Sequence, residues 1–128
     1  MATVKKITAV LLVKEIEPCL DLWMKRLGFE KTVEVPEGDA LGFVILVKDG
    51  FEVMYQSLAS VAKDVPAFAK RPAGKANLFI EVDSIDEVEH ALEGLKLVVP
   101  RRKTFYGSTE VGVLDAAGNV VMFAEMTG

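Results

Sequence analysis

Glu52 is the side chain in this sequence that is best placed for chemistry, because it is a carboxylate between two apolar neighbours. Phe51 and Val53 flank it in a segment with few other charges. Acidic side chains are seldom buried without a partner, so the apolar neighbours of Glu52 favour a functional role for its carboxylate. Burial would raise its pKa unless another group pairs with it. We predict that Glu52 pairs with a cationic or hydrogen-bonding ligand; the alternative is an edge-strand carboxylate in water.

One histidine and one cysteine limit the catalytic chemistry that is open to the chain. His90 falls off the apolar stripe of a predicted helix and is expected to face solvent. Cys19 lies on the apolar face of another predicted helix, as does Trp23, and both are expected in the core. Histidine-based acid–base catalysis and a histidine- or thiol-rich metal site are therefore disfavoured. No intramolecular disulfide is possible, so a reducing cytoplasm is the expected location.

Composition excludes several classes of function. The chain has 128 residues, 51% of them hydrophobic, and a net charge of −4. This composition fits one folded domain and argues against a binder of nucleic-acid backbones. The longest apolar run, 41–47, is too short to cross a membrane, and no signal peptide is visible. No phosphate-binding loop, dinucleotide fingerprint, nucleophile elbow or zinc-finger spacing is present.

The residues are positioned by a pattern that occurs twice. Segments 8–20 and 77–89 each run from an apolar strand through a polar turn into helical spacing. The first unit is predicted to contain strands 4–13, 29–35, 41–47 and 51–57, with a helix from about Glu15 to Gly28. The second is predicted to contain strands 76–82, 97–99, 109–114 and 120–126, with a helix after Ser84.

Local signals support these boundaries. Asp49-Gly50 suits a tight hairpin turn, and Ser84 with Glu87 forms a capping box. Residues 58–75 break the pattern and are predicted to be a connector, acting as a lid or a bridge, in which 58–63 is a candidate helical turn. Arg101, Arg102 and Lys103 are predicted to form a solvated basic edge; binding of an anionic ligand is the alternative.

We therefore predict an α+β fold in a single domain over 1–128. Repeat one spans 4–57, the connector 58–75 and repeat two 76–126. The two β-α-β-β-β repeats are expected to form a cup-shaped, partly open, barrel-like mixed sheet with the helices outside.

Three motifs give this doubled pattern a resemblance to a known family. They are Val13-Lys14-Glu15-Ile16 before a helix that ends in Leu27-Gly28-Phe29, Phe51-Glu52-Val53-Met54 after the Asp-Gly turn, and Asp115-Ala116-Ala117-Gly118-Asn119 before the last strand. Together they resemble the vicinal oxygen chelate superfamily, which includes glyoxalase I, bleomycin-resistance proteins and extradiol dioxygenases. Ala116 and Ala117 depart from the usual Asp-Pro-Asp-Gly-Asn form of the last motif.

The resemblance implies a site in the cup. In metal-dependent members four side chains project into it, and these positions fall here on Thr8, Glu52, Asn77 and Met122. Only Glu52 is a good ligand for a hard divalent cation, so no metal and no cofactor are predicted. Thr8 and Asn77 can hydrogen-bond a ligand and Met122 can supply an adaptable wall, although Thr8 and Met122 could instead fill the barrel. The predicted ligand-binding residues are Thr8, Glu52, Met54, Asn77, Phe79, Tyr106 and Met122, with no catalytic residues.

The favoured function is metal-independent binding or sequestration of a small, partly hydrophobic molecule. The molecule is expected to be cationic and antibiotic-like, as in the bleomycin-resistance branch, and the family resemblance implies a homodimer. The alternative is a metal-dependent glyoxalase- or dioxygenase-type enzyme with an atypical site. A third interpretation is a structural or regulatory module that binds no ligand. Tyr106 is interpreted either as a ligand-stacking residue or as a surface-turn aromatic.

Overall fold

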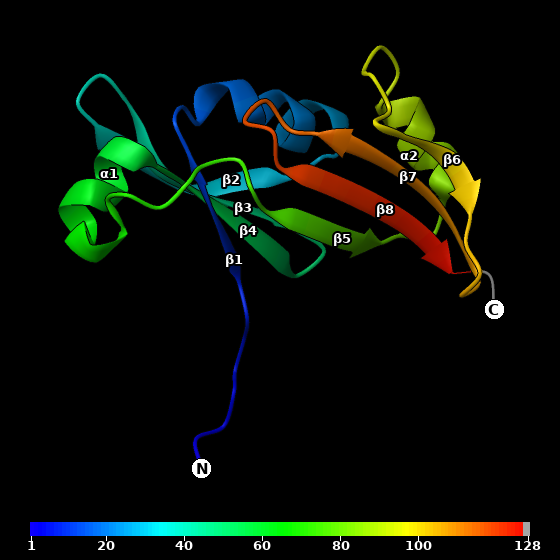
Figure 1. Cartoon of the computed structure of the whole chain (residues 1–128), viewed down its shortest axis with the longest axis horizontal. Coiled ribbons are helices and arrows are strands. Elements are labelled where there is room, and N and C mark those ends of the chain that lie inside the picture. The colour runs from blue at the N-terminus through cyan, green and yellow to red at the C-terminus, as the bar shows by residue number, and fades with distance from the viewer. Residues whose placement is uncertain (127–128) are drawn as a thin grey trace.

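The computed structural model of the chain describes residues 1–126, and these form two four-stranded sheets with short helices between the strands (Figure 1). The first sheet has the order β1-β4-β3-β2 and consists of β1 (Ala9–Val13), β2 (Glu30–Glu37), β3 (Ala40–Lys48) and β4 (Phe51–Ser57). The second has the order β5-β8-β7-β6 and consists of β5 (Asn77–Glu81), β6 (Val99–Lys103), β7 (Ser108–Leu114) and β8 (Val120–Met126). In both sheets the first strand pairs in parallel with the last. The predicted α+β fold with two repeated units is confirmed.

The turn between β3 and β4 forms where the sequence predicts it. Asp49 has a φ of 53° and Gly50 a φ of 82°, so both residues between the strands are left-handed. A two-residue hairpin turn of this type matches the twist of the strands it joins. It fixes the register in which Val47 lies opposite Glu52, and so determines the face on which Glu52 lies.

The first helical segment is not the regular α-helix that the apolar spacing predicts. It consists of a 3-10 turn, η1 (Glu17–Cys19), and a π-helix, η2 (Asp21–Arg26), in which Leu27 N–H donates to Leu22 O at 3.0 Å. The wider turn brings Leu22 into the core beside Trp23, although Leu22 is not on the predicted stripe. Gly28 follows with a φ of 79°, as a residue that ends a helix should.

The connector contributes a helix, α1 (Leu58–Asp64), and a 3-10 turn, η3 (Pro66–Phe68). Ser57 caps α1, because its hydroxyl accepts from Ser60 N–H at 3.1 Å. The second unit contains α2 (Ile85–Ala91), which Ser84 caps in the same way as predicted. Both helices therefore begin at a serine.

The basic segment 101–103 lies on β6, the edge strand of the second sheet, and its residues are exposed, so the predicted solvated edge is found. Arg101 donates to Asp86 at 2.8 Å and to Glu89 at 3.1 Å, and Arg102 binds Glu110 on β7. These acidic partners were not predicted.

One hydrophobic core is shared by both units. It is made of alternate residues of the strands and of apolar helix residues: Leu11, Val13, Ile16, Cys19, Leu22, Trp23, Val44, Leu46, Val53, Tyr55, Ile85, Val88, Leu92, Val111, Val113, Val121 and Phe123. Because successive strand residues point to opposite faces, the intervening residues point away from this core. We call these surfaces the open faces of the two sheets; Glu52 and Met54 lie on the first, and Phe79 and Met122 on the second.

The Asp115–Asn119 turn joins the two units. Asp115 accepts from the Tyr55 hydroxyl at 2.6 Å and from the backbone N–H of Ala117 and Asn119 at 2.9 and 2.8 Å. The Tyr55 oxygen accepts in turn from Trp23 Nε1 at 2.8 Å. The motif that carries the family resemblance is thus a buried structural connection.

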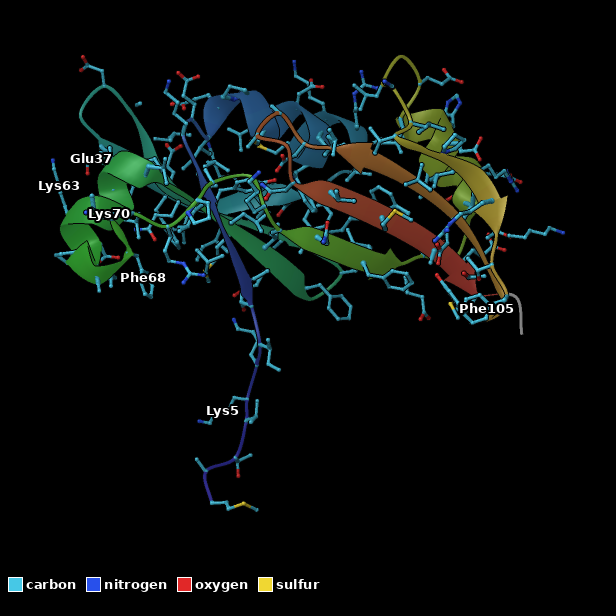
Figure 2. The ribbon with its side chains drawn as sticks, in the orientation of Figure 1. Lys5, Glu37, Lys63, Phe68, Lys70 and Phe105 are labelled. Carbon is cyan, nitrogen blue, oxygen red and sulfur yellow. The ribbon has the colours of Figure 1, made fainter. Side chains whose placement is uncertain are left out.

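The N-terminal segment 1–8 runs away from the rest of the chain, with Lys5 well outside the body of the molecule (Figure 2). The strand predicted for 4–13 begins only at Ala9, which lies opposite Val53 in parallel register. Because β4 begins at Phe51, residues before Ile7 have no strand residue to pair with. Val4 and Ile7 are 75% and 90% exposed.

Candidate functional site

Glu52 lies at the start of β4, on the open face of the first sheet. Its Oε1 accepts from Lys6 Nζ at 2.8 Å and from Thr8 Oγ1 at 3.1 Å, and its side chain is 16% exposed. The hydrogen bond from Lys6 lowers the pKa of Glu52, and this outweighs the effect of desolvation. The structure therefore brings Thr8 and Glu52 together, with an ammonium group of the same chain as partner.

The other predicted ligand-binding residues occupy different places. Met54 follows Glu52 on the same open face, two residues along β4. Asn77 and Phe79 lie on β5, and Phe79 is paired in register with Met122 of β8. These three side chains belong to the open face of the second sheet.

Tyr106 lies in the turn before β7, and its hydroxyl donates to Glu110. Glu110 is fully buried and also accepts from Ser108 Oγ at 2.8 Å and from Arg102 Nη2 at 2.8 Å. Sequence reasoning missed this cluster, since Glu110 stands in a strand and Arg102 was predicted to face solvent only. Phe105 stacks edge-on against Tyr106 and is itself exposed.

The four positions that hold a metal in related enzymes do not fit one here. They supply one carboxylate, a hydroxyl, an amide and a thioether, and the carboxylate is already bound by Lys6 and Thr8. Thr8 and Glu52 lie at the first sheet, Asn77 and Met122 on the second. Within residues 1–126, no three His, Cys, Asp or Glu side chains gather in a way that could hold a metal ion.

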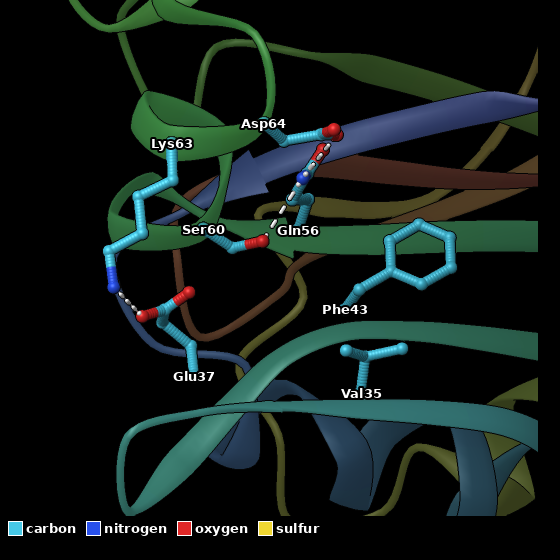
Figure 3. A pocket seen from close by; sticks show the side chains of 7 residues that line it. All are labelled: Val35, Glu37, Phe43, Gln56, Ser60, Lys63 and Asp64. Carbon is cyan, nitrogen blue, oxygen red and sulfur yellow. Dashed lines mark hydrogen bonds and ion pairs between the residues drawn. The ribbon is translucent and has the colours of Figure 1, made fainter.

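A pocket of about 490 Å³ lies at the other end of the first open face, where α1 meets the sheet (Figure 3). We call it the Gln56 pocket; it is lined by Val35, Glu37, Phe43, Gln56, Ser60, Lys63 and Asp64. The first three come from β2 and β3, Gln56 from β4 and the last three from α1. The connector helix therefore forms one wall, with the sheet as the other.

Strand register and a helix cap build this pocket. Val35 lies opposite Phe43, and Phe43 lies opposite Gln56, so the three side chains form a row across the sheet. Gln56 is the penultimate residue of β4, and the Ser57 cap then turns the chain into α1. Gln56 Nε2 donates to Ser60 Oγ at 3.1 Å and to Asp64 Oδ2 at 3.2 Å, which ties the helix to the sheet.

Gln56 lies on the same face of β4 as Glu52 and Met54, but sequence reasoning did not assign it to the site. The signal available was Ser57, a capping residue before a segment with helical character. Docking of α1 onto the sheet could not be inferred from a local pattern.

A second cleft, of about 740 Å³, opens between the two units. Glu52 and Phe79 both line it, together with Phe51 and Glu81. Residues predicted from the two repeats therefore meet at this cleft, whereas Asn77, Met122, Met54 and Tyr106 do not line it.

The cysteine and histidine side chains, which often act in catalysis, do not line either pocket. Cys19 is fully buried, and burial raises the pKa of its thiol to about 12. His90 is exposed on α2 and lies 3.2 Å from Glu93, as the surface interpretation predicts. Both residues therefore lie outside the open faces and the two pockets. No helix within the described residues 1–126 is long and apolar enough to cross a membrane.

Comparison with known proteins identifies the fold. No sequence-family profile matches the chain, and no match is found among curated protein sequences. Crystal structures do match over nearly the whole length. TnmS3, an antibiotic binding protein from Streptomyces sp. CB03234, is 18% identical with a TM-score of 0.74, and 99% of each chain is covered.

Two further structures match over a similar share of the chain. TioX from Micromonospora sp. ML1 is 17% identical, with a TM-score of 0.75 over 96% of this chain and 99% of that one. Lactoylglutathione lyase from Agrobacterium tumefaciens is 18% identical, with a TM-score of 0.75 over 97% and 95%. The chain thus has the two-unit fold of the glyoxalase, bleomycin-resistance and dioxygenase proteins, as the sequence motifs predicted.

Proposed function

We propose that this protein binds a small, partly hydrophobic molecule on its open faces without a metal ion. The observation that carries the proposal is the Gln56 pocket, in which apolar side chains stand beside a few convergent polar groups. Ligand pockets in proteins have this composition and a volume of roughly 300–1,000 Å³. The likeness to TnmS3, an antibiotic binding protein, supports the same function.

The residues predicted from the sequence remain our proposed contacts along the open faces. Met54 continues the apolar surface from the pocket toward Glu52, and Phe79 and Met122 provide apolar surface on the second sheet. Burial of such surface stabilises a complex by roughly 25 cal/mol per Å². Hydrogen bonds from Asn77 and Thr8, and the carboxylate of Glu52, would orient the ligand.

We further propose that the protein is a cytoplasmic homodimer. In such a dimer the open faces of two copies would face each other and cover their apolar side chains. Exposed apolar side chains on both faces support this, among them Val10, Val35 and Phe79.

Thermal unfolding in the presence of candidate ligands tests the binding function. A ligand that binds only the folded protein stabilises it by about 2.7 kcal/mol at a concentration of 100 times its Kd. We expect some members of a panel of hydrophobic amines and matched neutral compounds to raise the Tm in a concentration-dependent way. A panel in which no compound does so at millimolar concentration would favour a module that binds no ligand.

A metal-dependent enzyme is the second candidate, favoured by the likeness to lactoylglutathione lyase. After treatment with a chelator, the protein would be titrated calorimetrically with nickel, zinc, manganese and iron. Weak or absent heat is expected, because the donor set is poor. Tight binding of one ion per chain would support the enzyme and contradict the metal-independent function.

A further inference from the structure

We propose that the Gln56 pocket takes the protonated amine of a ligand that also carries a small apolar or aromatic group. The inference rests on the proposed binding function and assigns the chemical class that this pocket recognises. Its anchors are Asp64 and Gln56, neither of which is at a position taken from the family resemblance.

The charges of the pocket favour a cation. Lys63 Nζ lies 2.5 Å from Glu37 Oε2, so these two groups neutralise each other (Figure 3). Asp64 also lines the pocket, and no ammonium or guanidinium of the described residues 1–126 pairs with it. Two carboxylates and one ammonium leave the pocket with a net charge of −1, located on Asp64.

Gln56 supplies a second acceptor. The residue is only 9% exposed, and its amide nitrogen donates hydrogen bonds to Ser60 and Asp64, which line the same pocket. Its amide oxygen receives no hydrogen bond from the part of the chain that the structure describes. An accessible acceptor beside an uncompensated carboxylate matches an ammonium group, which has three donors and no acceptor.

The opposite wall is apolar. Val35 and Phe43 lie in one row with Gln56 across the sheet and stand in the same pocket. The face of the Phe43 ring can contact either an apolar group or a cation. A ligand with a charged end and an apolar end therefore fits the pocket better than a neutral polar molecule or an anion.

The position of Asp64 in its helix is costly for stability, which is consistent with a binding role. Asp64 is the last residue of α1, where backbone carbonyls make the helix end negative. An acidic residue is unfavourable there, and asparagine would be better tolerated. Asp64→Asn should therefore leave the Tm unchanged or raise it slightly, while it weakens binding of an amine.

The test is an NMR titration of the 15N-labelled full chain with 2-phenylethylammonium and with neutral 2-phenylethanol. For probes of this size, Kd on the order of 1 mM is expected. The ammonium should shift the Gln56 side-chain amide and the amides of α1, and the alcohol should bind at least about tenfold more weakly. Asp64→Asn should reduce affinity for the ammonium about tenfold.

The matched control is Glu34→Gln, which neutralises a carboxylate of β2 that pairs with Lys31 and lies outside the pocket. It should change the affinity less than about twofold. Glu52→Gln tests the other proposed contact of the ligand. A loss of affinity in Glu52→Gln but not in Asp64→Asn would overturn this inference and leave the proposed binding function in place. Equal binding of the alcohol, or no shift at Gln56 with a compound that raises the Tm, would also overturn it.

Discussion

The hydroxyl group of Tyr55 links the two units through two hydrogen bonds. It accepts from Trp23 in the first helical segment and donates to Asp115 in the second unit. Burial, and then the neighbouring Asp115 carboxylate, raises the pKa of Tyr55 far above its usual value, so it remains a donor at any accessible pH. Removing the oxygen would leave the buried Trp23 N–H without its partner.

We therefore predict that Tyr55→Phe destabilises the protein by about 2 kcal/mol, because a hydrogen bond to a carboxylate is lost and a buried donor is left unpaired. Urea unfolding followed by circular dichroism measures the loss. Trp23 is the one tryptophan, so its fluorescence emission should also shift. Tyr106→Phe is the control and should leave that emission unchanged; an unchanged stability of Tyr55→Phe would contradict the bridging role.

Glu110 shows how a buried acid can remain charged. Burial acts to raise its pKa, but hydrogen bonds from Tyr106, Arg102 and Ser108 together outweigh it, so its pKa lies below the usual value of 4.5. A carboxyl with a lowered pKa in the folded state contributes stability above its unfolded pKa. That contribution is lost as the pH falls through the folded pKa.

We predict that Glu110→Gln costs about 2 kcal/mol at pH 7, through loss of charged hydrogen bonds, and costs less at pH 3. Urea unfolding at both pH values measures the difference. The surface variant Glu34→Gln, whose partner is the nearby Lys31, serves as the control and should have a small effect. A penalty that is equal at both pH values would show that Glu110 matters for shape and not for charge.

At the scale of elements, the cap of α1 links stability to binding. Ser57 and Ser84 cap α1 and α2 through the same kind of hydrogen bond, at 3.1 and 3.2 Å. α1 lines the Gln56 pocket with Ser60 and Asp64, whereas α2 does not line it.

Ser57→Ala and Ser84→Ala should therefore each lower stability by about 1 kcal/mol, because each helix loses a capping acceptor. Only Ser57→Ala is expected to weaken binding of 2-phenylethylammonium as well, by about threefold, because the first turn of α1 loosens. Chemical denaturation and the NMR titration measure the two effects separately. Similar affinities in the two variants would mean that the position of α1 does not matter for binding.

Elements with strong local signals could be predicted from the sequence. The Asp49-Gly50 turn and the Ser84 cap depend on neighbouring residues, and both are found where expected. The π-helix could not be predicted, because its wider turn departs from the spacing on which helix prediction relies. The start of β1 at Ala9 depends on its pairing with β4, which is distant in the sequence.

The candidate site could likewise be predicted only in part. Alternation along β4 places Glu52, Met54 and Gln56 on one face, and strand periodicity suffices for that. Lys6 pairs with Glu52, and α1 forms the helical wall of the Gln56 pocket. Both lie in segments without a strong pattern. Tertiary contacts fix both, so neither could be inferred from the repeat.

At the scale of the whole molecule, the arrangement of the two sheets leaves apolar surface uncovered. The segment 1–8 adds to it, since its apolar residues Val4 and Ile7 have no contact that would bury them. β1 also stands at the edge of its sheet. Uncovered strand edges and apolar arms are surfaces on which a second chain can pack.

Deleting residues 1–7 should therefore weaken self-association of the protein. We expect the full chain to sediment as a dimer at about 50 μM. The dissociation constant of the truncated dimer should be at least about tenfold higher, because the arm no longer contributes apolar contact. Lys6→Gln is the matched control: it removes the ion pair with Glu52 at 2.8 Å but keeps Val4 and Ile7, so it should remain dimeric. A full-length chain that sediments as a monomer would contradict the dimer. Equal dissociation of the truncated and full-length chains would show that the arm does not hold it together.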